Sequence, residues 1–145
     1  MRNTVINDKL CVFAPLRENI MNENELSRVI VDKCLKIHRA LGPGLLESVY
    51  EEVLFYEFTR NSIPCKRQMG IPVVYEDIKL DLGFRADMII GDKVIIELKS
   101  VENILPVHKK QLLTYLKLTD MKLGLLINFN VELIKNGITR IVNNL

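Results

Sequence analysis

The sequence predicts one α/β domain, α+β-like in the order of its elements, with a single central sheet flanked by helices. Three observations lead to this fold class. The 145 residues are 48% hydrophobic and 26% charged, which is typical of an ordinary globular domain. Apolar residues follow the period of a helix before Cys65 and the period of a strand after it. The resulting order of helix, helix, strands, helix, strand fits one sheet with helices packed against it.

We expect residues 1–21 to form an extension outside the core and residues 22–145 to form the domain. The first residues show no sustained apolar period, whereas Asn22, followed three residues later by Glu25, is a signal that starts a helix. The expected elements are helices over residues 23–41, 45–59 and 106–118, and strands over residues 71–75, 78–82, 84–90, 94–99, 122–129 and 138–142.

Charge, cysteine content and hydropathy exclude several classes of protein. The net charge of +2 permits a nucleic-acid partner but is too small to argue for one. Cys11, Cys34 and Cys65 form no C-x-x-C pair, so they predict neither a disulfide framework nor a zinc site and favour the cytoplasm. No apolar run reaches membrane-spanning length and the N-terminus lacks the pattern of a signal peptide, so we expect no membrane partner.

The segment VIIELKS, residues 94–100, has the composition of a buried strand but carries two charges. Side chains two residues apart lie on one face of a strand, so Glu97 and Lys99 project together. Burying a charge without a partner costs several kcal/mol. One interpretation is a functional site, and the alternative is an ion pair on a half-exposed strand. The other face of this strand carries Val94, Ile96 and Leu98.

Asp87 lies on the preceding strand, and the length of the intervening loop decides where its side chain points. A three-residue loop over residues 91–93 places Asp87 directly opposite Glu97 on one face. A two-residue loop instead pairs Asp87 with Ile96 and puts the carboxylates on opposite faces. Two facing carboxylates repel unless a cation or a shared proton lies between them. Oxygen ligands of this kind suit Mg²⁺ or Mn²⁺ better than zinc.

An Asp, nine intervening residues and then Glu-x-Lys resemble the motif of the PD-(D/E)xK nuclease superfamily. Asp87 and Glu97-Leu98-Lys99 fit that motif, although Ala86 stands where a proline is usual. A competing match, Asp77-Ile78-Lys79, sits beside a turn in a polar hairpin where charges need no partner. The resemblance implies a restriction-endonuclease-like core, which is a central mixed sheet flanked by helices, and a divalent metal.

A second motif lies at the start of the second helix. Residues 44–50, Gly-Leu-Leu-Glu-Ser-Val-Tyr, resemble the G-x-x-E-x-x-Y signature of a small family of bacterial and archaeal proteins within that superfamily. The resemblance implies that Glu47 faces the active site and acts through the metal or its waters. The alternative is a glutamate that the dipole favours at a helix N-terminus. Glu51 and Glu52 are expected to point away into solvent.

A third motif, Gln111-x-x-x-Tyr115, lies on the helix after Glu-x-Lys. The spacing puts both side chains on one face of the helix. It resembles the Q-x-x-x-Y motif of recombination-type and phage-type exonucleases, which implies that Gln111 and Tyr115 position the nucleic-acid backbone. We expect this face to be distinct from the core face, which carries Leu112, Leu113 and Leu116.

These residues together predict a metal-dependent nuclease, with Mg²⁺ or Mn²⁺ as cofactor and DNA as the expected partner. A second possibility is a nucleic-acid-binding module that keeps the fold without turnover, and a third is a structural subunit. The expected roles are metal binding by Asp87, Glu97 and the Leu98 carbonyl, support of the metal by Glu47, water positioning by Lys99, and substrate binding by Gln111 and Tyr115.

Overall fold

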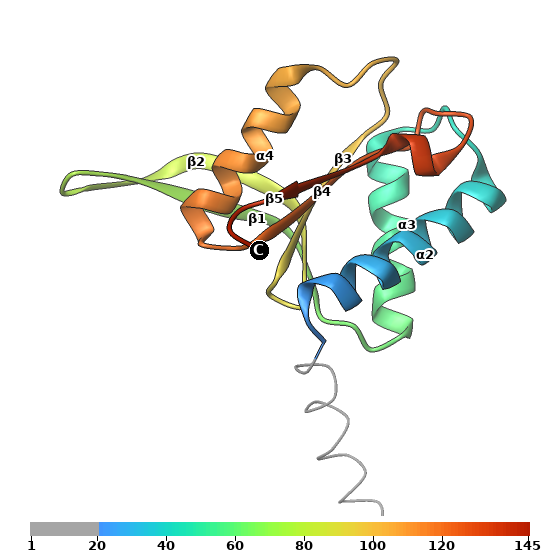
Figure 1. Ribbon diagram of the computed structural model, residues 1–145, viewed down its shortest axis with the longest axis horizontal. Coiled ribbons are helices and arrows are strands. Elements are labelled where there is room, and N and C mark those ends of the chain that lie inside the picture. The colour runs from blue at the N-terminus through green and yellow to red at the C-terminus, as the bar shows by residue number, and fades with distance from the viewer. Residues whose placement is uncertain (1–20) are drawn as a thin grey trace, which may run out of the picture.

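The computed structural model describes residues 21–145, the side chain of Leu82 excepted, and shows an α+β domain built on one mixed five-stranded sheet (Figure 1). The extension expected over residues 1–21 lies outside this range, apart from Met21, which is half-buried against the core. The elements are α2 (Glu23–Leu41), α3 (Glu47–Arg60), β1 (Cys65–Tyr75), β2 (Ile78–Ile90), β3 (Val94–Lys99), α4 (Pro106–Thr119), β4 (Leu123–Asn128), a 3-10 turn η1 (Ile134–Gly137) and β5 (Ile138–Val142).

The strands lie in the order β1-β2-β3-β4-β5. Only the pair β3 and β4 is parallel, and the other neighbours are antiparallel. A parallel pair needs a long crossover, and α4 provides it between β3 and β4. The expected fold class is therefore confirmed. No helix of the described residues is long and apolar enough to cross a membrane.

Three boundaries differ clearly from those expected. Strand β1 begins at Cys65 and not at residue 71, because its pairing with β2 runs from Cys65 opposite Ile90 to Tyr75 opposite Ile78. The strands expected over residues 78–82 and 84–90 are one strand, because pairing with β1 resumes on both sides of a register shift opposite Ile71 and Val73. Helix α3 begins at Glu47 and not at residue 45, because Leu46 has an extended backbone with φ −67° and ψ 148°. The first and third helices begin as expected, and Asn22 and Glu25 form the capping box.

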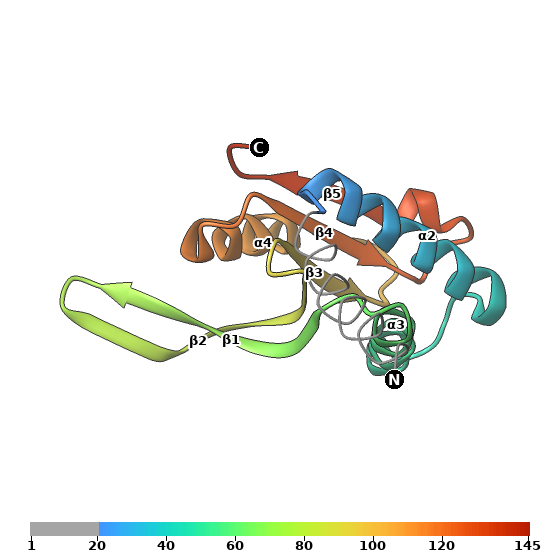
Figure 2. The same ribbon diagram turned by 90° about the horizontal axis from the view of Figure 1, so that it is seen from below.

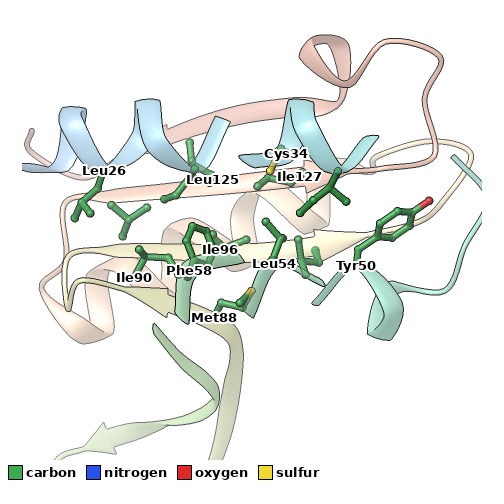
Figure 3. Packing of buried hydrophobic residues seen from close by; sticks show 14 of the residues in the cluster. Leu26, Cys34, Tyr50, Leu54, Phe58, Met88, Ile90, Ile96, Leu125 and Ile127 are labelled. Atoms are coloured by element: carbon green, nitrogen blue, oxygen red, sulfur yellow. The ribbon is translucent and has the colours of Figure 1, made fainter. Parts of the chain in front are cut away.

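Helices cover both faces of the sheet (Figure 2). Helices α2 and α3 pack on one face, where Leu54, Phe58 and Ile96 lie in the larger apolar cluster (Figure 3). Helix α4 packs on the other face through Leu112, Leu116 and their neighbours. Strand β3 contributes to both: Val94, Ile96 and Leu98 face α2 and α3, whereas Ile95 faces α4. By alternation Glu97 and Lys99 share the α4 face with Ile95.

The outer parts of β1 and β2 form a two-stranded ribbon that projects beyond α4 (Figure 2). Gly83 lies at the register shift within it, and a Cβ atom there would clash with the Ile71 carbonyl oxygen and approach Val73 to 3.0 Å. Only glycine therefore fits this β-bulge, which bends the ribbon and sets its twist.

Gly83→Ala should destabilise the ribbon by about 1–3 kcal/mol, because the added methyl group meets backbone atoms that have no room to move. Amide hydrogen exchange of β1 and β2 measures this local opening free energy. Gly70→Ala is the matched control, since a Cβ atom there would meet nothing within 4 Å. Equal exchange rates in the two variants would show that the close approach at Gly83 is not a constraint.

Candidate active site

Asp87 and Glu97 face each other across β2 and β3. Ile90 pairs with Val94, so residues 91–93 form the three-residue loop, and the expectation of facing carboxylates is confirmed. Regular pairing ends one step before Asp87, where side chains replace the backbone ladder. The Leu98 N–H donates to Asp87 Oδ2 at 2.8 Å, and the Asp87 N–H lies 3.4 Å from Glu97 Oε1. The two carboxylates are thus fixed to neighbouring strands at one point of the sheet.

Burial and mutual repulsion disfavour ionisation of this pair. Glu97 is only 6% exposed, and its pKa is raised to about 8, first by burial and then by the negative charge of Asp87. A side-chain hydrogen bond to Asp87 raises it further, as expected for carboxyl groups that share a proton. Burial also raises the pKa of Asp87, although the hydrogen bond from Leu98 opposes the shift. The alternative of a half-exposed Glu97–Lys99 surface pair is therefore wrong.

Lys99 projects from the same face as Glu97, as the alternation predicts. Its positive charge lowers the pKa of both Asp87 and Glu97, so the ammonium group lies near both carboxylates. Within residues 21–145, no hydrogen bond or ion pair holds the Lys99 side chain. An ammonium group near two acids but bonded to neither remains available to a ligand.

Glu47 reaches the same place from α3, and Tyr50 fixes the start of that helix. The Tyr50 hydroxyl donates to the Gly42 carbonyl at 2.6 Å and accepts from the Leu45 N–H at 3.2 Å. Its ring is fully buried and stacks on Phe129 at a centroid distance of 4.2 Å. The tyrosine of the G-x-x-E-x-x-Y pattern therefore holds the loop from which Glu47 projects.

The Glu47 carboxylate lies at the end of β3. Its Oε1 accepts from the Ser100 N–H at 3.3 Å, and its negative charge raises the pKa of Asp87. A cavity of about 500 Å³ opens beside it, lined by residues 44–48, Ser100 and Asn130. Glu47 also occupies the first turn of α3, so a favourable interaction with the helix dipole coexists with its position near Asp87.

Glu51 is a residue whose position the sequence interpretation got wrong. It was expected in solvent, but it is buried, and its charge raises the pKa of Asp87. Strand β1 supplies its partners: Arg67 Nε donates to Glu51 at 3.0 Å and Gln68 Nε2 at 2.8 Å. Glu51 follows Glu47 by four residues, so the helical repeat places both side chains on one face. This spacing was the signal in the sequence that could have predicted the position of Glu51 near the site. The expectation of an exposed position is right for Glu52.

Gln68 connects Glu51 to the facing pair. Its Nε2 lies 2.8 Å from Glu51 and 3.5 Å from Asp87 Oδ1, so one amide group reaches two carboxylates. The backbone of Gln68 has φ +50°, a left-handed conformation that costs energy in a residue other than glycine. Side chains change faces at this point in both strands: Arg67 lies against α3 and Ile71 under α4, and in β2 Met88 and Ala86 lie in different apolar clusters. No pattern in the sequence marks such a reversal.

Gln111 and Tyr115 lie on one face of α4, and the Gln111 side chain lowers the pKa of Tyr115. Burial raises the pKa of Tyr115 to about 12, and the charges of Glu97 and Asp87 raise it further. The expectation of a face distinct from the core is wrong for Tyr115, which is 3% exposed in the cluster beneath α4. The cause is Phe84 on the ribbon, whose ring lies 5.0 Å from that of Tyr115 and covers it. Gln111 is half-buried.

The oxygens at this point fit a hard divalent cation. Asp87 and Glu97 offer two carboxylates that repel in the absence of positive charge, which a cation would relieve. The Phe129 N–H bonds the Lys99 carbonyl on the β4 side, so by alternation the Leu98 carbonyl points toward Asp87. Within the described residues, no three Asp, Glu, His or Cys side chains are grouped closely enough to hold an ion. Two carboxylates and a carbonyl suit Mg²⁺, which keeps several of its waters.

Glu97→Gln should stabilise the metal-free protein above pH 5. The pKa of Glu97 is raised by folding, so the wild type loses stability as the pH rises from about 5 to 8 and this carboxyl ionises. The amide is nearly isosteric and uncharged, so we expect a gain on the order of 1–3 kcal/mol at pH 7 and a flatter pH profile. Urea unfolding at several pH values measures both quantities.

Glu57→Gln is the matched control, because Glu57 is also a buried carboxylate on the α2 and α3 side. The hydrogen bond from Lys36 lowers the pKa of Glu57, so the wild type gains stability above pH 5 from this group. Its amide variant should therefore lose stability in the pH range where Glu97→Gln gains it. A loss in both variants would mean that Glu97 is a structural carboxylate.

The comparison with known protein families agrees with this geometry. The family model described as PD-(D/E)XK nuclease superfamily matches residues 24–141, which run from α2 into β5 and include every residue described at the site. Searches of curated proteins and of solved structures gave no match. Since the family model covers most of the sequence, the chain belongs to the PD-(D/E)XK nuclease superfamily.

Proposed function

We propose that the protein is a metal-dependent nuclease that hydrolyses phosphodiester bonds in DNA with Mg²⁺ or Mn²⁺. The observation that carries this proposal is the buried pair Asp87 and Glu97, whose pKa values stay raised because the positive charge of Lys99 offsets burial and repulsion only in part. A fold would avoid this arrangement unless a ligand of positive charge completed it. The residues at positions 44, 47 and 50 support placing the chain in the smaller G-x-x-E-x-x-Y family.

Asp87 and Glu97 are the proposed metal ligands, with the Leu98 carbonyl as a third oxygen. Within the described residues, Glu47 does not join Asp87 and Glu97 in a single group of three metal ligands. This favours a role for Glu47 through metal-bound water. A divalent cation held there would polarise the phosphoryl group and lower the pKa of its bound water. Gln68 bonds both Glu51 and Asp87, so its amide keeps the Asp87 carboxylate aimed at the same point.

The remaining residues handle water and substrate. The Lys99 ammonium, which is near both carboxylates, holds the attacking water and stabilises the negative charge that develops on the phosphate. The water oxygen loses a proton to solvent and bonds to phosphorus as the bond to the leaving sugar oxygen breaks, and that oxygen takes up a proton from solvent. Tyr115 is held by Phe84 near the carboxylates, and Gln111 lies on the same face of α4, so the two side chains together meet the substrate backbone.

The experiment that tests this function is incubation with circular single-stranded DNA and with a linear duplex, each in Mg²⁺, Mn²⁺ or chelator. Cleavage of the circle requires an internal cut, whereas loss of the duplex alone indicates either attack from ends or a requirement for two strands. Cleavage that persists in chelator would contradict the metal requirement. Salt-sensitive retention of DNA without cleavage would favour a binding module.

Lys99→Met should keep metal binding but lower turnover by about 100-fold or more, because only the group that positions water and stabilises charge is lost. Calorimetric titration with Mn²⁺ and the nuclease assay measure the two effects separately. Lys79→Met is the matched control from the competing Asp-x-Lys segment, where Lys79 is exposed on the ribbon and no effect is expected.

In the same titration, Mn²⁺ should bind the wild type. In a separate thermal unfolding experiment, it should raise the melting temperature at neutral pH, because a cation binds only the folded site. The rise should shrink at acid pH as protons compete for the same oxygens. Glu97→Gln should lose both effects. A wild type that binds no Mn²⁺, or a Glu97→Gln variant that binds it equally well, would overturn the assignment of this pair as the metal site.

Gln111→Ala should raise KM for DNA more than it lowers stability, since Gln111 is half-buried and its proposed partner is the substrate backbone. We expect a loss of about 10-fold in kcat/KM with a melting temperature within a few degrees of the wild type. Thr114→Ala is the control on the exposed side of the same helix. A variant that unfolds but keeps its activity per folded molecule would identify Gln111 as a structural residue.

A further inference from the structure

The apolar face of the ribbon continues beyond the helix that covers it. Ile71 lies on this face beneath α4 and is 2% exposed. Two and four residues later along the same face, Val73 is half-buried and Tyr75 is 66% exposed. Their partners in β2 are Leu80 and Ile78, so both strands present apolar side chains to the same side. Figure 2 shows the ribbon running past the end of α4.

Such a face is unusual on a free hairpin. An isolated two-stranded ribbon is marginally stable in water, and an apolar edge strand invites pairing or packing with another surface. Here Tyr75, Ile78 and Leu80 are all more than 40% exposed on one face. Gly83 builds a tight bulge between this outer part and the base, so the ribbon holds a defined shape.

The charge of the ribbon argues against nucleic acid as the partner. Residues 70–84 carry three acids, Glu76, Asp77 and Asp81, against one base, Lys79, which gives a net charge of −2. A surface of this sign repels phosphate groups. The complementary partner has apolar side chains with lysine or arginine around them.

The outer side of α4 has that character. Five residues of α4 are exposed and fall within one stripe, a sector about 100° wide at 100° per residue: Val107, Lys110, Thr114, Lys117 and Leu118. The helix contains no acidic residue between Pro106 and Thr119. The stripe from Val107 to Leu118 is about 17 Å long, which is comparable to the rise of about 13 Å from Ile71 to Tyr75 along the ribbon.

We propose that two copies of this chain form a dimer by exchanging these surfaces. The bare ribbon face of each copy packs on the α4 stripe of the other copy. On that ribbon face, the partner's α4 lies next to the copy's own α4, which already covers the base of the ribbon. The acids at the ribbon tip then meet Lys110 and Lys117. A two-fold axis makes this contact twice and closes the assembly, leaving neither surface bare. The proposal concerns assembly and stands whether or not the protein cleaves DNA.

Sedimentation velocity on the full chain tests the exchange. We expect a dimer at about 50 µM that dissociates on dilution, since two small contacts give an interface at the low end of the size range. Tyr75→Ser combined with Ile78→Ser should weaken the dimer at least 10-fold. Tyr56→Ser is the control, because Tyr56 is 60% exposed but lies on α3.

Exchanging the charges of α4 and the ribbon tip distinguishes loss of a specific contact from local unfolding of the ribbon. Lys110→Glu with Lys117→Glu should weaken the dimer about 10-fold, and so should Glu76→Lys with Asp77→Lys. All four changes together should restore it, because the opposite charges meet again. The melting temperature of each variant reports on folding.

Three outcomes overturn the proposal. The first is a wild type that stays monomeric at 100 µM, and the second is a dimer that ignores the ribbon and charge variants alike. The third is loss of DNA retention in the Tyr75 and Ile78 variant with no change in mass, which would make nucleic acid the occupant. Each is read from mass or retention, so a failure of the nuclease assay does not affect the result.

Discussion

The repulsion between Asp87 and Glu97 is the constraint around which this domain is organised. The three-residue loop between β2 and β3 sets the register, and the register puts two carboxylates face to face inside the sheet. Burial raises the pKa of both groups. The metal-free fold therefore carries an electrostatic cost at neutral pH that a purely structural strand pair would not have.

Two hydrogen-bonded contacts keep the pair in place despite this cost, and a third positions Glu47 beside it. The Leu98 N–H binds Asp87 where the backbone ladder ends, so a side chain substitutes for a strand carbonyl. Gln68 accepts a left-handed backbone conformation in order to reach Asp87 and Glu51. Tyr50 anchors the loop from which Glu47 extends. Each contact is a side-chain hydrogen bond at a point where regular strand pairing or helix structure is interrupted, so the backbone alone would leave the site loosely defined.

The regular spacing of apolar residues made most of the fold predictable from the sequence. The places where that spacing is interrupted could not be predicted. The alternation in β3 and the loop length placed Asp87, Glu97 and Lys99 correctly, because both depend only on local geometry. Glu51 was misplaced because its partners come from β1, whose side chains change faces at Gln68. Likewise, Gly83 was read as a gap between strands because a bulge and a strand end carry the same residue.

The burial of Tyr115 shows how a distant contact alters a local pattern. Helical spacing puts Gln111 and Tyr115 on one face, but it does not say what covers that face. Phe84, at the base of the ribbon, covers Tyr115 and leaves Gln111 half-buried at the edge. The ribbon therefore serves two regions: its base closes the hydrophobic surround of the carboxylates, and its outer part presents a bare apolar face.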